Sequence, residues 1–152
     1  MAQSASITTN NIFKTKKVSL VETLYANAHW LLRLSLSSVF VYHGFNKFVD
    51  LDKFASMMNI PYSIALLVAL AELGGGILVF VGAFTKDWIT RAGAAMFIPV
   101  MLGAISMIHW PQWSFVPSPT HPMGGMEFQV VLLLLSIYIV IKGNAPEQRL
   151  IN

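Results

Sequence analysis

Residues 65–76 read ALLVALAELGGG, an apolar stretch that carries one carboxylate, Glu72, and ends in three glycines. Its neighbours extend it to a run long enough for a membrane helix, which needs about 20 mainly apolar residues. A charged side chain near the centre of such a helix costs roughly 2.5–3.5 kcal/mol on insertion scales, so it is seldom found there without a partner. Glu72 is therefore the best guide in the sequence to a functional site.

The composition of the whole chain indicates a membrane protein. Hydrophobic residues make up 55% of the 152 residues and charged residues 11%, whereas soluble domains carry about 25% charged residues. The net charge of +3 is modest and lies mostly near the chain ends, so we expect membrane lipid as a partner and no nucleic acid. The chain has no cysteine, which excludes disulfides, thiolate-bound metals and CxxC redox chemistry.

The apolar segments predict an all-α fold, an integral membrane four-helix bundle. We expect the spans at residues 30–48, 61–84, 88–109 and 126–142. The membrane domain would then cover residues 30–145, after a polar leader (1–29) and before a tail (146–152). Residues 18–29 of the leader are compatible with a short interfacial helix or with a disordered tail.

The distribution of Lys and Arg predicts that both termini are cytoplasmic. These residues gather in the leader, the second loop and the tail, whereas the third loop, residues 110–125, has none. Because cytoplasmic loops are enriched in Lys and Arg, the third loop is expected to face outward. Arg33, near the cytoplasmic end of the first span, is expected to snorkel toward the head groups.

Most ionisable residues between the tails are expected in the outer half of this bundle. The candidate polar or ligand-binding residues are Glu72, His43, Lys47, His109 and Glu127. Lys47 either snorkels outward or pairs with Glu72, and Glu72 is either a structural carboxylate or a group for proton handling or ligand binding. His43 and His109 are either polar packing groups or ligands.

Small residues predict where the helices approach closely. One side of the second span carries Ala65, Ala69, Glu72 and Gly76. The residues assigned to helix packing are Gly74, Gly75, Gly76 and, on the third span, Pro99. On the third span, Ala95, Pro99, Leu102, Ser106 and His109 are expected on one face. Pro99 removes a backbone hydrogen bond and is expected to bend that helix.

Few chemistries suit this set of residues. A quinone head group needs only a few polar contacts in an apolar pocket, so the sequence permits a quinone site while leaving the cofactor open. A metal site would need several of the histidines and carboxylates to converge, and no HxxxH or ExxH pair occurs, so none is predicted. A haem between His43 and His109 has little support, and no catalytic residue is recognisable.

Several motifs together resemble those of the DoxX family of small four-helix membrane proteins. They are LRL at 32–34, HGFNKF at 43–48, AELGGG at 71–76, GAFTK at 82–86, His109, and Glu127 with Phe128. The family takes its name from a subunit linked to thiosulfate:quinone oxidoreductase. The third loop is longer here than in short-looped members, and we expect it to cap a pocket or to bind another subunit.

The resemblance implies a subunit of, or an accessory to, a respiratory or quinone-linked redox complex, one that is not catalytic alone. Its partners would be other membrane protein subunits or further copies of the chain. The alternatives are an assembly or scaffold protein that holds partner helices and, with less support, a small transporter, since four spans without an internal repeat suit alternating access poorly. The expected location is the cytoplasmic (inner) membrane of a bacterium or an archaeon.

Overall fold

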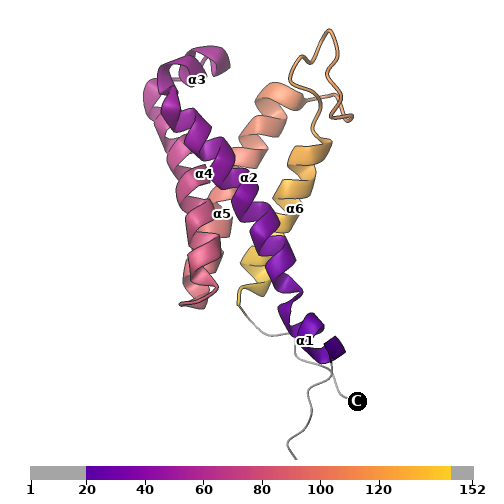
Figure 1. The fold of residues 1–152 in the computed structure, drawn as a ribbon. Helices are drawn as coiled ribbons and strands as arrows, with labels where there is room; N and C mark the ends of the chain where they lie inside the picture. Colours follow the sequence, from indigo (N-terminus) through magenta and orange to yellow (C-terminus); the bar gives the residue numbers. More distant parts are fainter. Residues whose placement is uncertain (1–19, 145–152) are drawn as a thin grey trace, which may run out of the picture.

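The computed structural model describes residues 20–144, apart from the side chains of residues 25 and 26, and all regular structure in this range is helical (Figure 1). The elements are α1 (Leu20–Asn27), α2 (His29–Val49), α3 (Leu51–Met58), α4 (Tyr62–Gly82), α5 (Asp87–Ala104), the π-helical turn η2 (Ile105–His109) and α6 (Glu127–Lys142). The predicted all-α class is confirmed for these residues. The predicted tail and residues 1–19 of the leader lie outside the described range.

The long helices, with α5 continued by η2, begin and end within one or two residues of the predicted spans. Two of them, α4 and α5 continued by η2, are long and apolar enough to cross a membrane. The 21 residues of α4 measure about 31 Å, close to the roughly 30 Å of a bilayer's hydrocarbon core. Helix α2 has 21 residues but carries Arg33 and Lys47, and α6 has 16 residues.

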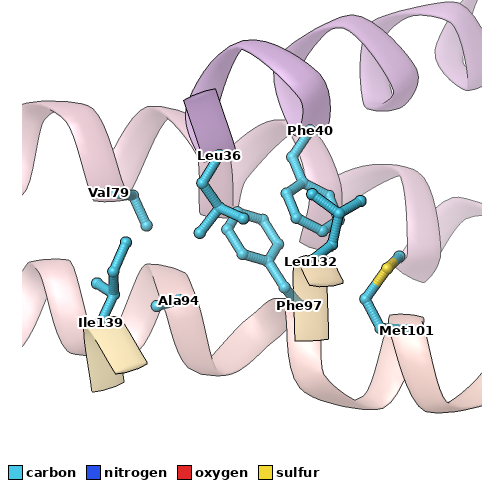
Figure 2. Packing of buried hydrophobic residues seen from close by; sticks show 8 residues of the cluster. All are labelled: Leu36, Phe40, Val79, Ala94, Phe97, Met101, Leu132 and Ile139. Atoms are coloured by element: carbon cyan, nitrogen blue, oxygen red, sulfur yellow. The ribbon is translucent and has the colours of Figure 1, made fainter. Parts of the chain in front are cut away.

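Each long helix packs through apolar side chains against the next long helix in the sequence. Helix α2 packs on α4, α4 on α5 and α5 on α6, with a smaller contact between α2 and α6. The buried cluster in Figure 2 draws from all four helices: Leu36, Phe40, Val79, Ala94, Phe97, Met101, Leu132 and Ile139. At its centre the rings of Phe40 and Phe97 stack, with centroids 3.6 Å apart and planes 4° from parallel.

The small-residue side of α4 is buried as predicted, since Ala65, Ala69, Glu72 and Gly76 all lie inside. A Cβ on Gly75 would lie 2.5 Å from the Phe97 ring of α5, and one on Gly76 would lie 2.7 Å from Val41 of α2. A Cβ on Gly74 would meet nothing closer than 3.9 Å. Close packing therefore requires two glycines of the run.

Of the five residues expected on one face of the third span, four are exposed, and His109 departs from them. The buried residues of α5 are Thr90, Gly93, Ala94, Phe97 and Met101, whereas Ala95, Pro99, Leu102 and Ser106 are exposed. Gly93 decides the rotation of the helix, because a Cβ there would lie 2.8 Å from the carbonyl oxygen of Gly75. His109 is buried, but it is the last residue of η2, where the N–H of Trp110 donates to the carbonyl oxygen of Ile105, five residues back. A spacing of 3.6 residues per turn cannot be extended through such a turn.

A short helix, α3, occupies a segment that the sequence analysis treats as a loop. The side chain of Asp50 caps its start by accepting the N–H of Lys53 at 3.0 Å, and Asn59 ends it in the left-handed conformation. The sequence did contain a signal for this helix, namely an Asp followed by apolar residues at helical spacing. In Figure 1, α3 and the loop of residues 110–126 lie at one end of the molecule, which we call the α3 end. Helix α1 lies at the opposite end, which we call the α1 end.

The loop of residues 110–126 folds back on itself before it enters α6. Backbone N–H groups of Gly125, Met126 and Glu127 donate to the carbonyl oxygens of Ser114, Gln112 and Trp113 at 2.8, 2.9 and 3.0 Å. These bonds give the loop a defined shape. They leave Trp110, Trp113 and Phe115 exposed.

Candidate ligand-binding site

A cavity of about 880 Å³ lies between the helices in the half of the molecule nearer the α3 end. Four of the five candidate polar residues line it, namely His43, Lys47, Glu72 and His109. Most of the remaining wall is apolar and includes five of the chain's eight methionines: Met57, Met58, Met101, Met107 and Met123. Such a wall suits a flat aromatic ligand, because thioethers adapt their shape and make favourable contacts with rings.

Lys47 and Glu72 form an ion pair at the edge of this cavity. The Lys47 ammonium donates to Oε2 of Glu72 at 2.5 Å, and the two side chains are 19% and 4% exposed. Of the two placements that the sequence allows for Lys47, the structure therefore has the inward one. The ammonium also lies 5.2 Å from the ring centroid of Phe54, so the pair connects α2, α4 and α3.

The approach of α2 to α4 at this level depends on Gly44. A Cβ at Gly44 would collide with the backbone of Leu73, the neighbour of Glu72. Because Gly44 has no side chain, the two helices come close enough for Lys47, almost one turn further along α2, to reach Glu72. The HGFNKF motif thus supplies both the glycine that permits the contact and the cation that makes it.

His109 is held with both ring nitrogens in use. Nδ1 lies 2.8 Å from the carbonyl oxygen of Gly124, and Nε2 lies 2.9 Å from the amide nitrogen of Gln129. A carbonyl oxygen can only accept, so Nδ1 carries the proton and Nε2 accepts from the Gln129 amide. A haem iron or another metal would have to displace one of these partners to bind His109.

Gln129 belongs to the cavity wall and was missed by the sequence analysis. Because its amide nitrogen faces His109, its Oε1 is directed elsewhere and has no hydrogen-bond donor among residues 20–144. The available signal was a single amide in the otherwise apolar run of α6. A buried acceptor without a donor costs about 1–3 kcal/mol, and this oxygen is enclosed in the protein without one.

The structure separates the other two candidate residues from the ion pair. His43 lines the same cavity one turn before Lys47, is exposed, and makes no hydrogen bond within the described part of the chain. Glu127 lies outside the cavity, in a smaller pocket of about 470 Å³ with Trp113 and Phe115 of the loop. The five residues that were expected to form one outer polar group therefore divide into three parts. These are the Lys47–Glu72 ion pair, the two histidines on the wall of the same cavity, and the separate carboxylate of Glu127.

Arg33 does not snorkel, and that prediction is wrong. It is 3% exposed, and its guanidinium donates to the carbonyl oxygens of Val79 and Gly143 at 3.3 and 2.8 Å. It also donates to the side chains of Thr90 and Asn144 at 3.2 and 2.8 Å. These contacts, here called the Arg33 network, join α2, α4, α5 and the end of α6. The sequence alone could not reveal them, because the partners lie 46 to 111 residues away.

Comparisons with known proteins agree with the resemblance seen in the motifs. The DoxX family model matches residues 28–110, which include α2, α4, α5 and the residues Lys47 and Glu72. Over 117 residues the chain is 32% identical to a Bacillus subtilis (strain 168) protein named "Putative oxidoreductase CatD", covering 75% of this chain and 78% of that one. No solved structure matches significantly. The chain belongs to the DoxX family, whose members are membrane-associated.

Proposed function

We propose that this protein is a quinone-binding membrane subunit of, or accessory to, a respiratory redox complex, and that it is not catalytic alone. The cavity beside the Lys47–Glu72 ion pair carries this proposal. Its volume of about 880 Å³ lies within the range of roughly 300–1,000 Å³ that is usual for small-molecule sites. Its polar groups, from eight of the 27 lining residues, stand in a mostly apolar wall, which suits a ring that carries two oxygen atoms.

The membrane arrangement is part of the proposal. Helices α2, α4, α5 with η2, and α6 would form four spans, with both termini in the cytoplasm and the α3 end facing outward. The absence of Lys and Arg from residues 110–125 supports this orientation. The 16 residues of α6 measure about 24 Å, so flanking residues would complete that span in the cytoplasmic membrane of a bacterium or an archaeon.

The relative named as an oxidoreductase supports a redox setting rather than a particular reaction. Within the described residues the cavity contains no cysteine and no serine. A quinone held there would exchange electrons with a partner subunit, and this chain would supply the binding site and its charge. We therefore place the chemistry in the complex and the pocket in this protein.

The test measures quinone retention. The tagged protein is extracted gently from its own membrane, and co-purified quinone is quantified by mass spectrometry of an organic extract. We expect the wild type to retain quinone and E72Q to retain several-fold less. Turnover of any oxidoreductase that co-purifies should fall in parallel.

The matched control is Gly74→Ala, also on α4, where a Cβ meets nothing closer than 3.9 Å. This variant should retain quinone like the wild type. A wild type without bound quinone, or equal retention in E72Q, would contradict the proposed function.

A scaffold role is the second candidate, and the loop of residues 110–126 favours it. Its exposed Trp113 and Phe115, on a shaped backbone, offer an apolar surface to a partner subunit. The double substitution Trp113→Ser and Phe115→Ser would then lower the amount of partner complex without changing activity per complex. The small-residue side of α4 gives no support to this role, because α2 and α5 already cover it.

A further inference from the structure

We infer that the start of α6, under the loop of residues 110–126, binds a phospholipid whose head group carries an ammonium, as in phosphatidylethanolamine. The site is the smaller pocket of about 470 Å³, which is lined by Trp113, Phe115, Glu127, Phe128 and Val131. Only Phe128 also lines the larger cavity. The inference rests on the proposed membrane arrangement and is independent of the proposed quinone.

The loop backbone holds this pocket against the start of α6. The N–H of Glu127 donates to the carbonyl oxygen of Trp113 at 3.0 Å, and the N–H of Gly125 donates to that of Ser114 at 2.8 Å. These bonds fasten the segment that carries Trp113 and Phe115 beside the first turn of α6, at the α3 end in Figure 1. The pocket is therefore shaped by the protein itself, and its aromatic side chains remain open at the surface.

The pocket contains a negative charge without a counter-ion. Glu127 is half-buried, and within residues 20–144 its carboxylate makes no ion pair and accepts no hydrogen bond. Residues 110–126 contain no Lys or Arg. The helix N-terminus adds about half a positive charge, which is less than the full charge of Glu127. Because aromatic ring faces also attract cations, the pocket suits an ammonium group and disfavours an anion.

The surface of α6 below Glu127 suits an acyl chain. Val131, Leu134 and Tyr138 follow Glu127 at steps of four, three and four residues, so they lie on one face of the helix. They are 52%, 60% and 46% exposed. From Glu127 to Tyr138 the helix rises about 17 Å, close to the depth of one leaflet in a hydrocarbon core of about 30 Å.

The width of this apolar stripe favours a lipid over a partner helix. Apart from Phe128, the other residues of α6 between Glu127 and Tyr138 are partly or fully buried. A packing helix needs a broad apolar face, whereas a single acyl chain can follow a stripe that is one residue wide. The carboxylate, the aromatic pocket and the stripe together match an ammonium head group with its chain.

The test maps lipid contacts on the unmodified protein. Full-length protein is reconstituted in phosphatidylglycerol vesicles that contain a small fraction of a phospholipid with a photoreactive diazirine in one acyl chain. This probe has an ethanolamine, a glycerol or an N-acetylethanolamine head group, and only the first carries an ammonium. Adducts are located by peptide mass spectrometry, and those on residues 127–138 are divided by those on α4, whose exposed Leu67 and Leu70 provide an internal reference.

We expect this adduct ratio to be about fivefold higher for the ethanolamine probe than for the other two. An effect of that size is expected for an exposed ion pair together with a cation–π contact. The glycerol and N-acetylethanolamine probes should give equal ratios, because neither has a cation for Glu127.

Variants locate the preference. Glu127→Gln keeps the size of the side chain and removes its charge, so the fivefold difference should fall toward one. Val131→Lys places an ammonium of the protein itself one turn after Glu127, in the order that favours an ion pair, and should also abolish the preference. The matched control is Asp52→Asn, which removes an exposed carboxylate at the same end of the molecule but outside the pocket. It should leave the preference unchanged.

The outcomes separate this inference from the proposed function. Equal ratios for all three probes would overturn it and leave the pocket to a cationic side chain of a partner protein. A preference that persists in Glu127→Gln would also overturn it. Absence of adducts from both α6 and α4 would contradict the membrane arrangement and the inference with it, whereas failure of the quinone test alone would affect neither.

Discussion

Helix α2 carries one buried or half-buried cation toward each end of the bundle, and the two cations have different surroundings. Near the α1 end, the guanidinium of Arg33 makes four hydrogen bonds to α4, α5 and the residues that follow α6. Toward the α3 end, Lys47 bonds to one carboxylate beside a cavity of about 880 Å³. Both side chains extend from the same helix, almost four turns apart.

The difference indicates which charge is structural. A guanidinium presents five donors in a fixed fork, so Arg33 can satisfy several carbonyl oxygens at once and join helices that are distant in sequence. An ammonium is a compact point charge, and Lys47 leaves Oε1 of Glu72 free. The Arg33 network holds the helices together, whereas the Lys47–Glu72 pair keeps a polar group available at a cavity.

The largest expected effect comes from removing the Arg33 network near the α1 end. Arg33→Met removes four hydrogen bonds, although Asn144 Oδ1 keeps the one from the Thr90 hydroxyl, so we expect a loss of about 3 kcal/mol or more in the free energy of unfolding. Arg33→Lys keeps the charge but cannot bridge the same acceptors, and it should lose less. Denaturant unfolding in one detergent measures both, and a wild-type midpoint for Arg33→Met would show that the network does not hold the helices.

Packing between the two ends should respond next. Gly75→Ala places a Cβ 2.5 Å from the Phe97 ring, and overpacking of this kind costs about 1–3 kcal/mol. Gly74→Ala places a Cβ no closer than 3.9 Å to any neighbour and should be neutral or gain up to about 1 kcal/mol, because alanine favours a helix more than glycine does. Equal unfolding midpoints for the two neighbours would contradict the assigned packing of α4 on α5.

The ion pair at the α3 end should matter less for stability than Arg33. Lys47→Met and Glu72→Gln are each expected to cost about 1 kcal/mol, since each leaves a partner unpaired. The double variant should lose less than the sum of the two, which a double-mutant cycle measures directly. Strict additivity would mean that the two side chains do not interact in solution.

The smallest expected effect is at Phe54. Phe54→Leu removes the ring near the Lys47 ammonium, and such contacts are worth about 0.5–1 kcal/mol. The loss should disappear when Lys47 is already Met, because no cation is then present. A loss of the same size in both backgrounds would assign it to packing of α3 instead.

Much of the local structure could be predicted from the sequence. Helix positions follow from the lengths of the apolar runs, and the ends of α2, α4, α5–η2 and α6 agree within one or two residues. The buried side of α4 follows from its small residues, which only one rotation of the helix can bring together. The short helix α3 was missed because eight residues are too few for a membrane span, although Asp50 marked its start and its apolar residues recur at helical spacing.

The candidate site could be predicted only in part. Glu72 and Lys47 were singled out because a charge in an apolar run needs a partner. Their pairing, rather than snorkelling by Lys47, depended on how closely α2 approaches α4 at Gly44. The role of Gln129 and the hydrogen bonds at both ring nitrogens of His109 were not predicted. An amide in an apolar run does not indicate which of its atoms will lack a hydrogen-bond partner.

The sequence by itself determined the class of the protein, its family and the residues whose charge requires an explanation. These properties depend on composition, on apolar run length and on motifs that are local in the chain. Only the tertiary structure decided that Arg33 is buried, that α5 packs through Gly93 and Phe97, and that Glu127 lies apart from Glu72. Each of these depends on the rotation and spacing of helices that are far apart in sequence, and contacts between distant surfaces set those quantities.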